Sequence, residues 1–335
     1  MGSSTTSIQS VVDYVSSMGE LAPVLPSGGY SVATALTIST DVMGELIAER
    51  FNWKWNRMRI APFYTNSWQL DYVLLKASMP AAIGWLEAAY WIDINNTSLP
   101  KPTHPIEVKR DLPMTSISGN PPAKIAWHYN NQLVQGVWPG PNKVYTQPLG
   151  ALSTPTNPPT NILDANGNIL LLTTYGTTGS ATPLLPVNSA EGATVNDGSC
   201  VWTAVNPNGQ GLRIWPLPPQ QGVVYQVNVV AQMMAPPAFT SMAQMINPVP
   251  DDYARWFRDG FYAWCYKMSP NPQARAQFPQ MKQEWLLAME KARKQGDREE
   301  DNSMFYPDRT SVAPAGYIDV GPAWPYSGTG IWPGR

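Results

Sequence analysis

The segment that decides the fold is Asp251-Asp-Tyr-Ala-Arg-Trp-Phe-Arg-Asp-Gly-Phe-Tyr-Ala-Trp-Cys-Tyr-Lys-Met268, which carries the strongest helical pattern in the chain. Its large apolar residues recur every three or four positions, as on one face of an amphipathic helix. They are Tyr253, Trp256, Phe257, Phe261, Trp264, Cys265 and Met268. Pro250-Asp251 precedes this face and Ser269-Pro270 follows it, as expected at the two ends of a helix. The pattern predicts a helix whose apolar face must be covered by other elements.

The next segment predicts a second helix that could cover part of this face. Asn271-Pro272 supplies a cap and a first-turn proline, and Gly296 is a typical stop. We expect Pro279 to kink this helix or to mark its true start. Its apolar residues are Phe278, Met281, Trp285, Met289 and Ala292. The helix-packing core predicted from both segments is Trp256, Phe257, Phe261, Trp264, Phe278 and Trp285.

Two more helical patterns lie near the N-terminus. Apolar residues at helical spacing follow a Ser/Thr cluster within 5–18, which predicts a short capped helix. A second pattern runs from Ser31 to Phe51 and then changes to the alternation Phe51-Asn-Trp-Lys-Trp55. Here we expect extended or mixed backbone whose large aromatic rings pack under the helices. The helices from both ends are therefore expected to fold back together.

Between Ile60 and Gln147, short apolar runs alternate with prolines and turn residues, which predicts an irregular antiparallel sheet. The runs are 68–75, 92–94, 124–129 and 133–138, and 81–90 is interpreted as a short helix. Further on, Tyr225–Met233 alternates apolar and polar residues and is the clearest strand in the sequence. We expect it to form a hairpin with Gly211–Pro216.

A compositionally separate segment lies between these parts, because no Lys or Arg occurs between Lys143 and Arg213. Asp164–Asn168 and Asn196–Ser199 contain the Asn-Gly and Asp-Gly pairs that tight hairpin turns favour. We therefore predict a small all-β insert over 147–207. The expected fold class is α+β: a helical bundle formed by the N- and C-terminal helices plus an antiparallel β domain. The expected body comprises 1–146 and 208–306, followed by an extended C-terminal arm over 307–335.

The arm combines closely spaced Pro and Gly with large aromatic residues. Flexible tails are normally poor in such residues, so we expect these rings to dock onto a folded surface. That surface is either the chain's own domain or a neighbouring subunit or other protein. The second alternative is favoured because aromatic residues supply most of the energy of interfaces. The expected contact residues are Tyr317, Trp324, Tyr326 and Trp332.

Charge and composition argue against tight nucleic-acid or membrane binding. Charged residues make up 14% of the 335, below the usual share of about 25%, and 22 basic residues face 24 acidic ones. The chain therefore has no overall basic field to grip a duplex. The longest apolar stretch, 79–92, is interrupted by Gly84 and Glu87 and is too short for a bilayer of about 30 Å.

Motifs of the common enzyme classes are absent from the sequence. It contains no Gly-x-Ser-x-Gly elbow, no phosphate-cradling Gly-x-x-x-x-Gly-Lys-Ser/Thr and no dinucleotide-binding glycine pattern after a strand. His104 and His128 are too few for a histidine metal cage, and Cys200 and Cys265 too few for a disulfide framework. The Asp164 turn lacks the glutamate of a calcium loop. We therefore expect no catalytic residue, no metal, no cofactor and no enzymatic activity.

The order of these elements resembles the head-to-tail adaptor proteins of tailed bacteriophages, the group that includes the tail tubular protein A of short-tailed phages. The resemblance covers residues 5–145 and 209–306. It is carried by Ser7–Met18, by Phe51-Asn-Trp-Lys-Trp55, by Leu212-Arg-Ile-Trp-Pro-Leu-Pro218 with the strand 225–230, and by Val249-Pro-Asp-Asp-Tyr253. The insert is similar to small β modules of phage tail and fibre proteins that are described as carbohydrate-binding-like. Compact adaptors lack such an insert.

The resemblance implies a structural virion protein, made in the host cytoplasm and located in the neck at the head–tail junction. It implies a homo-oligomeric ring, usually of twelve copies, with the portal protein above and the tail or nozzle protein below. DNA would pass through the ring during ejection without sequence-specific binding, and the arm would contact portal or neighbouring subunits. The alternative is a tail or virion-surface glycan-binding protein that acts through 147–207, and a third is an enzyme of unrecognised type.

Overall fold

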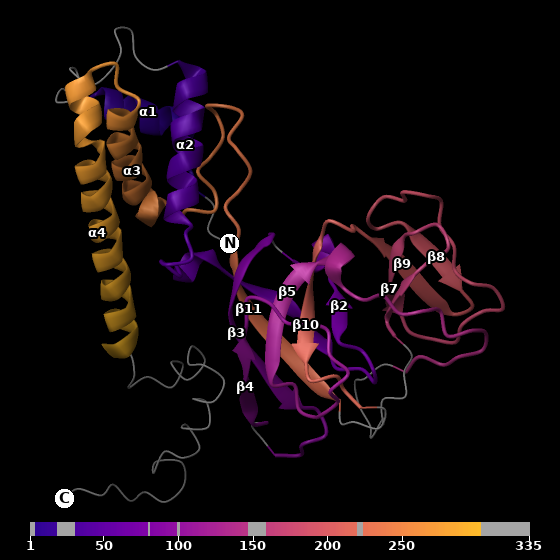
Figure 1. Cartoon of the computed structure of the whole chain (residues 1–335). Helices are drawn as coiled ribbons and strands as arrows, with labels where there is room; N and C mark the ends of the chain where they lie inside the picture. The colour runs from indigo at the N-terminus through magenta and orange to yellow at the C-terminus, as the bar shows by residue number, and fades with distance from the viewer. Residues whose placement is uncertain are drawn as a thin grey trace, which may run out of the picture. The chain divides into compact units, whose positions relative to one another are not determined.

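The computed structural model describes residues 4–18, 31–79, 81–98, 101–146, 159–219 and 224–302. These residues form two compact units (Figure 1). Of the described residues, those up to Arg57 and those of 232–302 form a helical unit, whereas those of Met58–Ala231 form a β unit. The predicted α+β class is confirmed.

The helical unit contains α1 (Ile8–Ser16), α2 (Val32–Leu46), α3 (Ala254–Lys267) and α4 (Pro272–Asn302). The Ser7 side chain accepts a hydrogen bond from the backbone of Ser10, and Ser31 does the same for Thr34. These bonds satisfy donors that the first turn of a helix leaves open. All four helices were predicted, and α3 contacts each of the other three.

Helix α4 differs from its prediction at its C-terminal end, because it continues past Gly296 to Asn302. It begins at Pro272, so Pro279 lies inside the helix and does not mark its start. Proline removes one backbone hydrogen bond from a helix interior. Aromatic contacts on both sides of Pro279 offset this loss: the ring centroids of Phe278 and Trp285 lie 5.2 and 5.4 Å from that of Trp264, both edge to face.

The aromatic face of α3 forms the centre of the helical unit. Phe257 and Phe261 are completely buried, and Trp264 and Trp285 nearly so. Trp256 and Phe278 are partly buried. After α2, Trp53 is buried, stacks on Phe51 at 5.5 Å and donates its indole N–H to the carbonyl of Leu46 at 2.7 Å. The expected packing of this aromatic segment under the helices is therefore confirmed.

Residues 4–6 are tied to the start of α3 by Asp251, the first residue of the short 3₁₀ helix η5 (Asp251–Tyr253) that precedes α3. Its carboxylate accepts hydrogen bonds from the hydroxyls of Ser4, Thr5 and Thr6 at 2.8, 2.7 and 3.0 Å. It also accepts from the backbone N–H groups of Thr5 and Thr6 at 3.0 and 3.2 Å. These bonds hold the pKa of Asp251 well below its ordinary value, and the hydrogen bond from the Thr5 hydroxyl contributes most to this shift.

The β unit contains a seven-stranded sheet in the order β1-β11-β3-β4-β5-β10-β2 (Figure 1). The strands are β1 (Arg57–Tyr64), β2 (Asp71–Val73), β3 (Ile83–Asp93), β4 (Thr103–Val108), β5 (Lys124–Tyr129), β10 (Gln210–Trp215) and β11 (Tyr225–Met233). Strand β10 pairs antiparallel with β2 and β5, and β3 pairs antiparallel with β4. Strands β4 and β5 run parallel, which was not predicted.

Three details of the predicted sheet were wrong. Segment 81–90 is the strand β3, not a helix, because burial of Ile83, Leu86 and Ala89 at three-residue spacing imitates a helical pattern. Strands β10 and β11 do not form a hairpin: β10 lies between β5 and β2, and β11 between β1 and β3. The run 133–138 forms an isolated bridge at Gly136 rather than a strand. In contrast, the alternating burial predicted for β11 is confirmed over its first seven residues, whereas Gln232, expected on the wet face, is completely buried.

A second sheet contains β6 (Asn161–Leu163), β7 (Ile169–Thr174), β9 (Cys200–Val205) and β8 (Thr194–Asp197), in that order. Both predicted hairpin turns are present, with Gly167 at φ +81° and Gly198 at φ +64°. The core of this sheet extends beyond the predicted insert, because Tyr145 packs edge to face on the buried Trp202 at 5.7 Å.

Helices α2, α3 and α4 approach one another closely at Gly260. A Cβ atom there would lie 2.6 Å from Cζ2 of Trp285 and 2.8 Å from Cγ1 of Val42. We expect Gly260→Ala to lower the free energy of unfolding by about 1–3 kcal/mol through overpacking, despite the higher helix propensity of alanine. The matched control is Gly44→Ala in α2, where no atom lies within 4 Å of the added Cβ. Urea unfolding should show that this control is neutral or stabilising; equal effects of both variants would contradict the prediction.

The Asp251 tie predicts a pH dependence of stability. Because its folded-state pKa lies below the unfolded value of about 4, Asp251 stabilises the fold above about pH 4. That contribution is lost as the pH falls below about 4 toward the folded-state pKa. The melting temperature of Asp251→Asn should therefore lie below that of the wild type at neutral pH and approach it in acid. The exposed neighbour variant Asp252→Asn serves as the control, and a gap independent of pH would refute the assignment.

Candidate functional site

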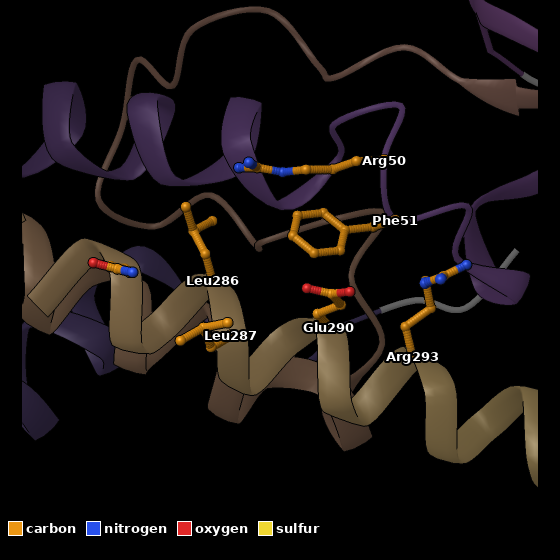
Figure 2. A pocket seen from close by; sticks show the side chains of 7 residues that line it. Arg50, Phe51, Leu286, Leu287, Glu290 and Arg293 are labelled. Atoms are coloured by element: carbon orange, nitrogen blue, oxygen red, sulfur yellow. The ribbon is translucent and has the colours of Figure 1, made fainter. Parts of the chain in front are cut away.

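A small groove lies on the helical unit between the residues that follow α2 and one side of α4 (Figure 2). Its volume is 290 Å³, and it is lined by Arg50, Phe51, Gln283, Leu286, Leu287, Glu290 and Arg293. We call it the α4 groove. Phe51 is 2% exposed and Leu287 is 49% exposed, so the groove joins the apolar core to open apolar surface.

Charged side chains border the α4 groove. The guanidinium of Arg50 lies 4.9 Å from the centre of the Phe51 ring and pairs with the Glu45 carboxylate at 2.7 Å. Glu290 pairs with Lys294 at 2.9 Å. This hydrogen bond, followed by the charges of Lys294, Arg293 and Arg50, lowers the pKa of Glu290. The groove thus combines an apolar floor with ionised edges.

The α4 groove has the size of the smallest ligand sites. Sites for cofactors and drug-sized molecules usually enclose about 300–1,000 Å³, and this groove lies just below that range. The sequence interpretation missed it. A signal was nevertheless present, because Leu287 is an apolar residue of α4 outside the predicted apolar stripe, next to Leu286.

A buried polar cluster in the β unit was also missed. Asp71 and Arg213, 1% and 5% exposed, form a two-pronged ion pair with N–O distances of 2.7 and 2.9 Å. The carboxylate also accepts the backbone N–H of Val134 at 2.7 Å, and the guanidinium donates to the carbonyl of Leu112 at 2.9 Å. Nearby, the Gln69 amide hydrogen-bonds the Asn161 side chain, which connects the two sheets. Because their charges are paired and hydrogen-bonded within the protein, Asp71 and Arg213 have a structural role.

Both histidines occupy structural surroundings. His128 lies on β5 with its Nε2 atom 3.7 Å from Asp111, and burial, followed by the charge of Arg213, lowers its pKa. His104 stacks on Trp91 at 4.1 Å. The Asp164 carboxylate accepts the backbone N–H groups of Asn166 and Asn168 at 2.9 and 2.8 Å, as in a turn. Within the described ranges, no group of three or more potential ligands is arranged to hold a metal ion.

The predicted contact residues of the arm, Tyr317, Trp324, Tyr326 and Trp332, lie outside the described residues. The aromatic residues of the predicted insert are Tyr175 and Trp202. Trp202 is completely buried in the core of the second sheet, and Tyr175 is partly buried against that core. None of the helices in the described part of the chain has the length and apolar character required to cross a membrane.

The buried ion pair yields a stability prediction. Asp71→Ala leaves the Arg213 charge buried without its partner, which is expected to cost about 3–5 kcal/mol of unfolding free energy. Glu107→Gln is the control, because it breaks an ion pair with Lys109 that is exposed to water and should therefore change the unfolding free energy little. The double variant Asp71→Leu/Arg213→Met should recover most of the loss. Denaturant titration measures all three, and a loss below about 1 kcal/mol for Asp71→Ala would disprove the assignment.

Comparison of the chain with protein-family models, with curated proteins and with solved structures finds no match.

Proposed function

We propose that this chain is a structural head-to-tail adaptor of a tailed bacteriophage. Copies of it form a ring, usually of twelve, between the portal protein and the tail or nozzle protein in the neck of the virion. The ring joins head to tail, and DNA passes through it during ejection. The protein is no enzyme and needs no cofactor.

The observation that carries this proposal is that helices before and after the β unit in the sequence join in one helical unit. Helices α1 and α2, which precede the β unit, pack with α3, which follows it, and Asp251 binds residues 4–6. The intervening residues form the β unit. This supports the adaptor-type arrangement of a terminal helical bundle, a β domain and a β insert that the sequence resemblance implies.

Electrostatics supports the same function. A duplex carries one negative charge per about 1.7 Å, and tight binding requires many basic side chains. The chain has 22 basic and 24 acidic residues, so a ring of it would let DNA slide. The alternative, glycan binding by the insert, receives less support: sugar sites commonly use exposed aromatic rings, whereas Trp202 is completely buried and Tyr175 is partly buried against the same core.

Two measurements test the adaptor function. Native mass spectrometry and negative-stain imaging of the purified chain, alone and with its portal protein, should show closed rings of about twelve copies. Deletion of Pro307–Arg335 should weaken portal attachment at least tenfold in a pull-down, because it removes the proposed contacts of the arm.

If the chain without Pro307–Arg335 attaches to the portal protein as strongly as the full chain, the arm has no role in this attachment. The adaptor proposal would give way to the glycan-binding alternative under two conditions. The full chain would have to stay monomeric with and without portal protein, and it would have to bind a glycan on an array.

A further inference from the structure

The α4 groove has the chemistry that holds an aromatic ring. Leu286 and Leu287 offer an apolar surface on one side, while the guanidinium of Arg50 already lies over the Phe51 ring (Figure 2). Arg293 lies farther along the same lining. Guanidinium groups stack on aromatic faces, and leucine side chains cover ring edges. A second ring entering this groove would therefore meet both kinds of contact.

The volume of the groove limits its occupant to one large side chain. At 290 Å³ it has room for one large inserted side chain, whatever backbone carries that side chain. Extended proline-containing segments insert single side chains into grooves of this kind, because proline keeps their backbone straight and limits the entropy lost on binding. The fitting ligand is thus an aromatic residue flanked by proline in an extended chain.

The segment that follows α4 in this chain has that composition. Residues 303–335 contain five prolines and six aromatic residues, and Trp324-Pro-Tyr326 places two rings on either side of a proline. The segment has two acidic and two basic residues, so it brings no net charge against Arg50, Glu290 and Arg293. It is the part of the chain best suited to the groove.

The length of this segment allows it to reach another copy. Helix α4 has 31 residues and is about 46 Å long at 1.5 Å per residue. The 33 residues after it would span about 100 Å if extended at 3.1 Å per residue. A segment longer than the helix that precedes it can leave its own unit and bind the next one.

We propose that Trp324 of one copy docks into the α4 groove of a neighbouring copy. This inference rests on the proposed function, because it supplies the contact between subunits of the ring. The contact joins two different surfaces, a segment and a groove, so each copy offers one of each. Such head-to-tail contacts close into rings when the rotation between copies allows it.

The test uses two chains that each lack one half of the contact. Leu287→Asp places a charge in the groove, and because Leu287 is half exposed, the fold should be kept, as checked by the melting temperature. The other chain ends at Asn302 and lacks the segment. Each alone is expected to stay monomeric under conditions in which the wild type assembles. An equimolar mixture should form a 1:1 complex and nothing larger in native mass spectrometry, since one groove and one segment remain.

Two further variants make the assignment specific. Val32→Asp replaces another exposed apolar residue of the helical unit, 58% exposed and outside the groove, and should assemble like the wild type. Trp324→Ala in the Leu287→Asp chain should weaken the 1:1 complex at least tenfold.

Normal assembly of Leu287→Asp, or a mixture without a complex, would overturn the inference. Rings formed equally by the wild type and by Leu287→Asp leave the adaptor function standing and remove only this contact. A wild type that stays monomeric while the mixture forms the complex would place the segment in its own groove and overturn docking between copies.

Discussion

The helical unit depends on covering the aromatic face of α3. Phe257, Phe261 and Trp264 cannot face water without a large loss of hydrophobic free energy, and α1, α2 and α4 all contact the helix that carries them. Elements from both ends of the chain are therefore required: α4 follows α3 directly, while α1 and α2 come from more than 200 residues away. Gly260 allows these helices to approach closely, and Asp251 holds residues 4–6 beside the start of α3.

Local patterns predicted much of this fold. The four helices could be identified because a 3.6-residue period, serine caps and prolines act within a few residues of each other. The Asn-Gly and Asp-Gly turns of the second sheet were equally clear, because Gly167 and Gly198 adopt the positive φ that these pairs favour. Strand β3 was misassigned because its buried residues are three apart, a spacing that helices share.

Long-range partners could not be predicted from one sequence. The hairpin of β10 and β11 was inferred from their closeness along the chain, yet β10 instead pairs with β2 and β5, the former about 140 residues earlier. The Asp71–Arg213 pair and the α4 groove were missed for the same reason, because each brings together residues that are far apart in the sequence. Arg50 and Phe51 meet α4 only because α2 and α4 both pack on α3. Only the misplaced Leu287 hinted at that site.

The helical unit is built from two separate segments of the chain, and this has a consequence for synthesis on the ribosome. The β unit is formed from one continuous stretch, Met58–Ala231, so its residues are all available before α3 is made. Helices α1 and α2 emerge first but lack their main partner until α3 appears about 208 residues later. At about 5–20 residues per second, their apolar faces wait roughly 10–40 seconds. The earliest helices of this protein are thus the last to be completed, and their exposure during this interval is a natural point for chaperone binding.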